Sequence, residues 1–427
     1  METDILIVGS GCSGLYCALC LPDDKKITVI TKSAVEESDS FLAQGGICVL
    51  KDESDFDSFF EDTLKAGHYE NDRESVKIMI ESSRDVISDL VGFGVDFCRD
   101  DDGNFRYTRE GAHSQSRILY HKDITGREIT SKLLARARER ANIKILENTT
   151  LLDIIEQSGE CVGAVILNNH GETKTIKADF TVLATGGIGG LFKHSTNFRH
   201  LTGDALAIAL DHGIALKNPD YVQIHPTTLY SPNDRDRCFL ISESVRGEGA
   251  KLYNKNMERF VDELLPRDLL TKAIHKQMAL DGSNFVWEDL RPIPEDILRE
   301  HFPNIVEHCR SKGYDVTKQC IPVVPAQHYF MGGVKIDHFG KTSMPNLYAV
   351  GETACNSVHG KNRLASNSLL ESLVFAKRAA RDINQHPAID HRPLPPVDLN
   401  RYADIKALER RYKKIVLEEI NRRNENV

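Results

Sequence analysis

Long apolar runs and an excess of positive charge are both missing from this sequence. No stretch approaches the roughly 18–20 consecutive apolar residues that a membrane-spanning helix needs. The formal net charge is −9 at pH 7 and no cationic run is long, which argues against a nucleic-acid binder. The opening Met-Glu-Thr-Asp carries acidic groups where a secretory signal peptide requires positive ones. We therefore expect a cytoplasmic protein with neither a membrane nor a nucleic-acid partner.

Cysteine pairs that would form a disulfide framework are also missing. The ten cysteines are scattered through predicted core elements rather than grouped. Cys17 and Cys20 have Cys-x-x-Cys spacing, but they fall inside the first predicted helix and no second pair completes a metal site. Free cysteine behaves as a small hydrophobic residue, so we expect reduced, mostly buried thiols and no metal.

A strand, a glycine-rich turn and a helix are predicted at the start of the chain. Residues 4–8 form an apolar run that leads into Gly9-Ser10-Gly11-Cys12-Ser13-Gly14 and the helix 15–21, and residues 26–30 form a second strand. G-x-G-x-x-G at such a turn can place a pyrophosphate on the helix N-terminus. The alternative is a glycine-rich turn without a ligand. Lys32 stands where an acidic residue for a ribose is expected, which weakens an NAD hypothesis.

Three predicted strands end at glycine. They cover residues 5–8, 180–184 and 347–350. This recurrence is typical of a large two-nucleotide cofactor that meets the carboxyl edge of a parallel sheet. The loop 38–46 consists of small and amide residues, which suits wrapping a flat ligand with backbone N–H groups.

At 427 residues the chain is too long for one simple core. Residues 219–329 are richer in Pro, Arg and His and poorer in strand signals, so we expect an inserted domain that covers the ligand. A proline-rich linker at 386–396 and a charged amphipathic helix at about 398–425 follow. The predicted division is ligand-binding domain 1–218, capping and substrate domain 219–329, second part of the ligand-binding domain 330–385, and linker with a short helical region 386–427.

Four short tracts carry polar groups that are costly to bury without a purpose. They span residues 223–227, 242–249, 265–268 and 326–333. Together with Arg363 they supply two histidines and three arginines. Arginine pairs with a carboxylate through two hydrogen bonds and histidine adds a directional donor, so the set suits a dicarboxylate. Each histidine alone is compatible with an ordinary buried core residue.

The ordered motifs resemble those of the succinate dehydrogenase, fumarate reductase and L-aspartate oxidase flavoproteins. The resemblance covers the chain to about residue 385 and rests on G-x-G-x-x-G, A-Q-G-G, A-T-G-G, H-P-T, R-G-E-G, P-R-D, H-Y, G-G-V and N-R-L-A-S-N-S-L-L-E. It implies an α/β fold: a Rossmann-like FAD-binding domain with an inserted α+β capping domain and a short C-terminal helical remnant. In succinate dehydrogenases a histidine five residues before the Gln of A-Q-G-G is joined covalently to FAD. Asp39 takes that place here, which implies non-covalent FAD.

One tract selects the oxidase branch of this family. Arg109-Glu110-Gly111-Ala112-His113-Ser114 is similar to the oxidase tract E-G-G-H-S, with Ala112 in place of the second glycine. In the oxidases that glutamate faces the amino group of the substrate. A carboxylate can pair with the ammonium group of an amino dicarboxylate, whereas succinate has no ammonium group for it to bind. The other reading of Glu110 is a solvated loop acid. The resemblance therefore implies oxidation of L-aspartate to iminoaspartate, the first step of NAD biosynthesis toward quinolinate.

The resemblance also assigns roles at the substrate. His225, His328 and Arg363 would hold the two carboxylates, with Ser242 as an additional donor. Arg267 matches the acid/base arginine of the family. Because the pKa of arginine stays above about 12, we expect Arg267 to act as an electrostatic and orienting group rather than as a base. Glu243 and Arg246 would line the site or shape its charge.

A further set of residues would bind FAD. The pyrophosphate would lie at the first glycine turn, with Lys32 near the adenosine. The helix start at Ser368 and Leu369 would lie under the pyrimidine end of the ring, where its positive end stabilises a reduced anion. The complete set is Gly9, Ser10, Gly11, Ser13, Gly14, Lys32, Ser40, Ala43, Gln44, Gly45, Asp204, Glu352, Ser368 and Leu369.

Family oxidases usually continue into a C-terminal helical bundle, whereas this sequence ends at Val427 after one predicted helix. Oligomeric contacts, or docking to quinolinate synthase as the next enzyme, are therefore open. The electron acceptor is open too, between oxygen and fumarate. Three alternatives remain: a soluble fumarate reductase, a flavoprotein module of a membrane complex, and a catalytically silent flavin-binding homologue.

Overall fold

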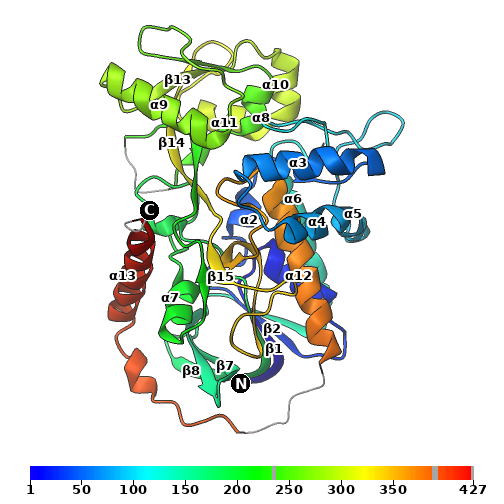
Figure 1. The fold of residues 1–427 in the computed structure, drawn as a ribbon, viewed down its shortest axis with the longest axis vertical. Coiled ribbons are helices and arrows are strands. Elements are labelled where there is room, and N and C mark those ends of the chain that lie inside the picture. The colour runs from blue at the N-terminus through cyan, green and yellow to red at the C-terminus, as the bar shows by residue number, and fades with distance from the viewer. Residues whose placement is uncertain (233–236, 387–392, 425–427) are drawn as a thin grey trace.

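The computed structural model describes residues 1–232, 237–386 and 393–424, which form two bodies stacked along the long axis (Figure 1). The lower body is built on a seven-stranded sheet with the order β5-β2-β1-β8-β7-β6, and β16 pairs with β8. Its strands are β1 (Glu2–Val8), β2 (Ile27–Ile30), β5 (Ile143–Leu146), β6 (Thr150–Gln157), β7 (Glu160–Leu167), β8 (Thr173–Leu183) and β16 (Leu347–Ala349). The expected Rossmann-like arrangement is confirmed.

The parallel strands are apolar along their length because both faces of the sheet are covered. Ile5, Leu6 and Ile7 of β1 are all buried, as expected for a central parallel strand. The face that receives Ile5 and Ile7 packs against α1 (Cys12–Cys20), α6 (Thr125–Glu139) and α12 (Asn367–Gln385). The face that receives Leu6 packs against α7 (Asp204–Asp211) and α13 (Ile405–Asn424).

The strand register brings the three predicted glycine corners together. Val8 of β1 is paired with Leu183 of β8, and Leu183 is also paired with Ala349 of β16. The carboxyl ends of all three strands therefore lie at one edge of the sheet. Short alternating strands with Gly and Asn turns in residues 143–185 predict a β-meander. Strands β6, β7 and β8 form an antiparallel meander, but β5, at the start of this segment, pairs in parallel with β2 instead.

Small elements complete the lower body. The sequence predicts one amphipathic helix over residues 72–92. That extent is wrong, because the segment is split into α4 (Arg73–Glu81) and α5 (Ser83–Gly92) at Ser82. The Ser83 hydroxyl donates to the Ile80 carbonyl at 2.6 Å and accepts the Leu50 amide at 3.0 Å, which ties the break to a distant strand end. The remaining elements are α2 (Asp39–Leu42), α3 (Phe56–Ala66), β3 (Ile47–Cys48), β4 (Ile118–Leu119), β9 (Leu216–Lys217), β15 (Gly333–Lys335), β17 (Ala354–Cys355) and the 3₁₀ turns η1 (Glu53–Asp55), η2 (Gly189–Leu191), η3 (Gly351–Thr353) and η4 (Leu399–Tyr402).

The upper body is a five-stranded antiparallel sheet with four helices and its own apolar core. The strand order is β11-β10-β14-β13-β12. The strands are β10 (Val222–Leu229), β11 (Phe239–Leu240), β12 (Lys251–Tyr253), β13 (Val286–Asp289) and β14 (Ile321–Phe330), and the helices are α8 (Glu243–Gly247), α9 (Arg267–Asp281), α10 (Glu295–His301) and α11 (Pro303–Ser311). This body lies within the segment expected to cap the ligand, although the strand signals there were weak. The domain boundaries at 218/219 and 329/330 stay a prediction.

The C-terminal segment returns to the lower body. Helix α13 begins at Ile405, later than expected, and lies beside α7 (Figure 1). The Tyr412 hydroxyl donates to the Leu152 carbonyl at 2.7 Å and fixes α13 on β6. Of the predicted linker 386–396, residues 387–392 lie outside the described part of the chain. Among the described helices, none combines the length and apolar character needed to cross a membrane.

Candidate active site

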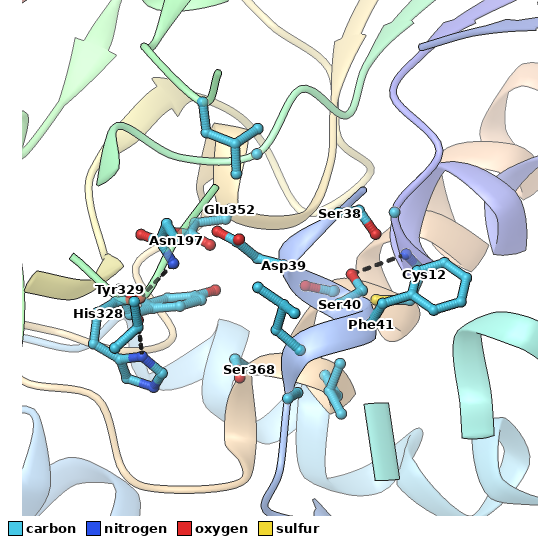
Figure 2. A pocket seen from close by; sticks show the side chains of 18 of the residues that line it. Cys12, Ser38, Asp39, Ser40, Phe41, Asn197, His328, Tyr329, Glu352 and Ser368 are labelled. Atoms are coloured by element: carbon cyan, nitrogen blue, oxygen red, sulfur yellow. Dashed lines mark hydrogen bonds between the residues drawn. The ribbon is translucent and has the colours of Figure 1, made fainter. Parts of the chain in front are cut away.

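A cavity of about 440 Å³ lies where the carboxyl edge of the large sheet meets the upper body. Figure 2 shows part of its wall, with Asp39, Ser40, Glu352 and His328 around a common space. Every predicted site residue except Gly14 and Arg246 lines this cavity. The structure therefore brings together residues separated by most of the chain length.

The first glycine turn forms one end of the cavity, and each glycine has a steric reason. A Cβ at Gly9, where φ is +123°, would lie 1.9 Å from the Ala184 carbonyl oxygen. A Cβ at Gly14 would lie 2.1 Å from the Gly9 oxygen, so Gly14 allows close packing of α1 on the turn instead of lining the cavity. The Cys12 amide, in the first turn of α1, donates to the Ser40 hydroxyl at 3.0 Å. This bond ties the predicted flavin loop to the helix start.

Lys32 and Asp204 form an ion pair at the same end. Lys32 Nζ is 2.6 Å from Asp204 Oδ2 and donates to the His200 carbonyl at 3.2 Å. The Thr202 hydroxyl donates to the other Asp204 oxygen at 2.7 Å. The acid that is absent from the end of β2 is therefore supplied at this point by the first residue of α7.

Two buried carboxyl groups face the middle of the cavity. Glu352 Oε1 accepts the Phe330 amide at 2.9 Å, and burial with the nearby Asp39 charge raises the pKa of Glu352 to about 8. Asp39 Oδ1 accepts the Phe198 amide at 3.0 Å, and burial raises the pKa of Asp39 to about 7. Asp39 Oδ2 is buried without a partner among the described residues. A buried unpaired acceptor in a cavity wall calls for a ligand that donates hydrogen bonds.

The start of α12 forms another part of the wall. Ser368 and Leu369 are the second and third residues of this 19-residue helix, and its N-terminus carries partial positive charge. Ser366, with φ +60°, occupies the N-cap position of the helix, but its hydroxyl donates to Glu110 and makes no capping bond to the helix backbone. Arg363 donates from one terminal nitrogen to the Ser368 hydroxyl at 2.6 Å. The predicted cofactor and substrate residues are therefore in direct contact here.

A glutamine joins the two arginines. Gln223 Oε1 accepts from Arg267 at 2.9 Å and from Arg363 at 3.3 Å, and its amide nitrogen donates to the Arg363 carbonyl at 2.8 Å. Burial, together with the Arg267 charge, lowers the pKa of Arg363 to about 10. Two guanidinium groups are thus held next to each other in a closed space, which is the arrangement that a pair of carboxylates can neutralise.

His225 and His328 face each other with ring centroids 5.2 Å apart. Burial and the surrounding arginine charges hold both pKa values well below the usual histidine value, so both rings are neutral. His225 Nδ1 receives the Thr227 amide at 3.2 Å, with the Thr227 carbonyl at 3.0 Å from the same nitrogen. His225 Nε2 is buried and has no partner among the described residues. Each ring can give one hydrogen bond to a ligand.

Glu110 is held by two serine hydroxyls. Ser244 donates to Oε1 at 2.7 Å and Ser366 donates to Oε2 at 2.6 Å. Burial, and then the charge of Glu243, raises the pKa of Glu110. The side chain is 4% exposed and lines the cavity, so the reading of Glu110 as a solvated loop acid is wrong.

Ser242 and Arg246 are engaged within the upper body. The Ser242 hydroxyl caps α8 by accepting the Ser244 amide at 3.3 Å, although its side chain still lines the cavity. Arg246 does not line the cavity. It donates to the Thr227 hydroxyl and, at 3.2 Å, to the Glu263 carbonyl, so its effect on the site is through charge and position.

Some residues of the site were missing from the predicted set. Gln223 holds both arginines without lining the cavity, and although it falls in the polar tract 223–227, no role was predicted for it. Tyr329 follows His328 and carries the Arg363 guanidinium 4.4 Å above its ring. No comparable signal marks Thr196, Asn197 or Arg237.

Comparison with known proteins agrees with this geometry. The family model described as "FAD binding domain" matches residues 4–369. The chain is 49% identical over 419 residues to an L-aspartate oxidase of Clostridium perfringens, covering 98% of this chain and 94% of that protein. It is 50% identical over 384 residues to an L-aspartate oxidase of Clostridium acetobutylicum, covering 90% and 88%. Among solved structures, an Escherichia coli quinol fumarate reductase chain superposes with a TM-score of 0.86 at 29% identity, covering 96% of this chain and 74% of that one.

Proposed function

Because the chain belongs to the L-aspartate oxidase family of FAD-binding flavoproteins, we propose that it oxidises L-aspartate to iminoaspartate, the first step of NAD biosynthesis toward quinolinate. The observation that carries the proposal is the position of Glu110. A carboxylate lines the same cavity as two neutral histidines and two arginines. An ammonium group beside two carboxylate groups is the ligand that matches all of these charges.

The described residues fit FAD. The glycine turn leaves room for a pyrophosphate at the start of α1, and the unpaired Asp39 Oδ2 offers an acceptor to a hydroxyl-bearing ligand. FAD held there would supply the acceptor for the hydride that leaves the substrate Cα, with oxygen or fumarate as the final electron acceptor. The proposed contacts come from Gly9, Ser10, Gly11, Ser13, Lys32, Ser40, Ala43, Gln44, Gly45, Asp204, Glu352, Ser368 and Leu369, with Gly14 in a packing role.

Attachment of FAD is proposed to be non-covalent, because Asp39 lacks the nucleophilic nitrogen of a histidine. Denaturing the purified yellow protein with acid tests this directly. Free FAD should appear in the supernatant while the protein pellet is colourless. Flavin that stays with the pellet contradicts non-covalent attachment.

The substrate carboxylates are proposed to bind between His225, His328, Arg267 and Arg363. Gln223 holds the two guanidinium groups at a fixed spacing before the substrate arrives, which reduces the ordering that binding requires. The positive charge of Arg267 is stabilised by Glu243, with Nε to Oε2 at 2.6 Å, so Arg267 orients and attracts the substrate. The Ser242 hydroxyl donates to the Ser244 hydroxyl at 3.3 Å, so it would add a donor to the substrate only by turning away from that oxygen.

Glu110 is proposed to receive the substrate amino group. The serine hydroxyls occupy one lone pair on each carboxylate oxygen, which leaves the others for substrate N–H groups. The amine must give up a proton as the carbon–nitrogen double bond forms. Burial raises the pKa of Glu110, which makes this carboxylate a better proton acceptor than an exposed one.

The most informative experiment is anaerobic mixing of the flavin-loaded protein with L-aspartate. Bleaching of the visible flavin band, with formation of oxaloacetate after hydrolysis of the imine, is the expected result. Succinate at the same concentration should bleach the flavin far less. Bleaching by succinate but not by L-aspartate would overturn the proposal, and no bleaching by either would indicate a catalytically silent homologue.

The second candidate function is a fumarate reductase that oxidises succinate. It is favoured by the superposition on a quinol fumarate reductase and by the cationic set, which suits fumarate equally well. Glu110 counts against it as the main activity.

We also propose the cytoplasm as the site of action and quinolinate synthase as the partner that receives the product, which a pull-down with that enzyme would test.

A further inference from the structure

The loop before α7 is fixed in register on β14, the strand that carries His328. The His194 carbonyl accepts the Gln327 amide at 2.9 Å, and the Thr196 amide donates to the Gln327 carbonyl at 2.9 Å. Asn197 adds a side-chain bond from Nδ2 to the His328 carbonyl at 3.1 Å, drawn in Figure 2. The position of the Thr196 backbone beside His328 is therefore set by backbone pairing and does not depend on the hydroxyl.

The Thr196 hydroxyl has two acceptors within reach. His328 Nδ1 lies 2.8 Å from Thr196 Oγ1, whereas the Gln327 carbonyl lies at 3.4 Å and already accepts the Thr196 amide. The shorter contact to the unoccupied acceptor is the stronger hydrogen bond. The hydroxyl can donate to His328 Nδ1, or it can donate to the Gln327 carbonyl and accept from Nδ1–H; the first arrangement gives the hydroxyl proton the shorter contact and makes Nδ1 an acceptor.

A neutral imidazole carries one N–H, so an accepting Nδ1 places the proton on Nε2. His328 lines the cavity, and no hydrogen bond to Nε2 occurs within the described ranges. Nε2–H is then free to donate to a ligand. In the opposite tautomer Nε2 would present a lone pair, which repels a carboxylate oxygen.

We propose that Thr196 is a positioning residue that fixes His328 as the Nε2–H tautomer and so makes it a donor to a substrate carboxylate. The choice of a carboxylate as acceptor rests on the proposed function. The tautomer is assigned from the shorter of the two hydroxyl contacts, and the ¹⁵N experiment below tests it independently of the proposed function. Thr196 belongs to the lower body, and His328 lies on the strand that joins the two bodies. The Thr196–His328 contact therefore also fixes His328 relative to the lower body.

The test compares Thr196→Val, which keeps the shape but removes the hydroxyl, with Thr196→Ser, which keeps the hydroxyl. Loss of one buried hydrogen bond should raise the KM for L-aspartate about tenfold in Thr196→Val. The kcat should change less than about twofold, because the bond acts on binding in both the ground and transition states. Thr196→Ser should stay within about twofold of wild type on both constants.

A matched control is Thr228→Val. The Thr228 hydroxyl is buried in the same sheet and donates to the Val324 carbonyl at 2.7 Å, but it does not line the cavity. This variant loses one buried hydroxyl bond without touching His328, so its KM should equal that of wild type. Equal KM increases in Thr196→Val, Thr196→Ser and Thr228→Val would mean that general packing, and not the tautomer, is responsible, and the proposal would be overturned.

The tautomer of His328 can be measured directly in the ¹⁵N spectrum of histidine-labelled, flavin-loaded protein. The His328 signals are assigned by their loss in the His328→Asn variant. Wild type should show a protonated Nε2 and an unprotonated Nδ1. A protonated Nδ1 overturns the proposal, whether or not Thr196→Val folds. Perturbation of the flavin band by fumarate tests dicarboxylate binding separately, so failure of the proposed function remains distinguishable from failure of this inference.

Discussion

Arg267 donates from Nε to Oε2 of Glu243 at 2.6 Å, and both side chains are buried. Burial alone would raise the pKa of Glu243, but the charges of Arg267 and Arg246 outweigh burial and hold that pKa below its usual value. The two residues begin α9 and α8, so the pair also joins two helices of the upper body. Replacing Arg267 should therefore change both the activity and the stability of the protein, and the two effects can be measured separately.

Replacing Arg267 by Met removes the charge and most of the hydrogen bonds while keeping an apolar chain of similar length. We expect turnover with L-aspartate to fall at least about 100-fold, the scale of losing a preorganised electrostatic group. The free energy of unfolding should fall by about 3 kcal/mol, because Glu243 is left buried and unpaired. Steady-state kinetics and denaturant unfolding measure the two effects.

The double variant Arg267→Met with Glu243→Gln separates these causes. Removing the stranded charge should restore most of the lost stability, whereas turnover should stay low because no cation faces the substrate. If the double variant regains activity together with stability, Arg267 acts only by supporting the fold, and its proposed role at the substrate is wrong.

Glu110→Gln tests substrate choice. The amide keeps the size of the side chain and can still contact Ser244 and Ser366, but it carries no negative charge for an ammonium group. We expect kcat/KM for L-aspartate to fall about 100-fold, since one charged partner at a buried site is lost. Fumarate reduction by the reduced protein should change less than about threefold, because fumarate has no amino group.

The comparison needs both assays on the same preparation. Glu160→Gln, at the exposed turn between β6 and β7 and outside the cavity lining, serves as a control that should leave both activities unchanged. A similar loss of L-aspartate oxidation and fumarate reduction in Glu110→Gln would count against recognition of the amino group by Glu110.

Asp123 joins the two bodies at a helix start. Its Oδ2 accepts the Ile305 amide in the first turn of α11 at 2.8 Å, and its side chain is buried and lines the cavity. Asp123→Ala should destabilise the protein by about 1 kcal/mol through loss of a helix cap. It should also raise the KM for L-aspartate and speed limited proteolysis, because the upper body is held less firmly over the cavity.

Asp72→Ala is the matched control for this effect. Asp72 caps α4 by accepting the Ser75 amide at 2.8 Å, remote from the cavity. The Asp72→Ala variant should lower the free energy of unfolding by a similar amount without changing the KM for L-aspartate. A KM that is unchanged in Asp123→Ala as well would show that this contact does not control closure of the upper body.

The residues at the cofactor end of the site could be predicted from the sequence for a physical reason. The phosphate turn and the start of α12 are local structures, in which glycine, serine and helix-capping residues must stand at fixed spacing. The three glycine corners could be combined into one edge because parallel strands align their carboxyl ends, as Val8, Leu183 and Ala349 do. Substrate residues were found mainly through the family motifs.

Residues that act through another side chain were not predictable in the same way. Gln223 meets Arg363 across 140 positions and Thr196 meets His328 across 132, so no local window contains both partners. The break of the predicted helix 72–92 at Ser82 has the same origin, since the bond from Leu50 to Ser83 is tertiary. Such residues become visible only when the strands and loops that carry them are placed side by side.

Glu288 gives the protein a pH-dependent stability. It lies on β13 in the core of the upper body, and neither carboxyl oxygen has a partner among the described residues. Burial raises its pKa from 4.5 to about 7, against a lowering by the Arg246 charge. Between these two values the folded protein holds a proton that the unfolded chain has released, so stability falls as pH rises through this window.

The full effect above the folded pKa is roughly 3 kcal/mol, from the 2.5 difference between about 7 and 4.5. Asp39, Glu352 and Glu371 also have raised pKa values and act in the same direction, so wild type alone cannot isolate Glu288. The Glu288→Gln variant should remove only the part of the pH dependence of stability that comes from Glu288. Unfolding free energies measured near pH 5 and near pH 8 should therefore differ less in Glu288→Gln than in wild type, with the gain in stability confined to the higher pH. The same pH dependence in both proteins would mean that Glu288 is ionised in the fold across the whole range, held there by Arg246.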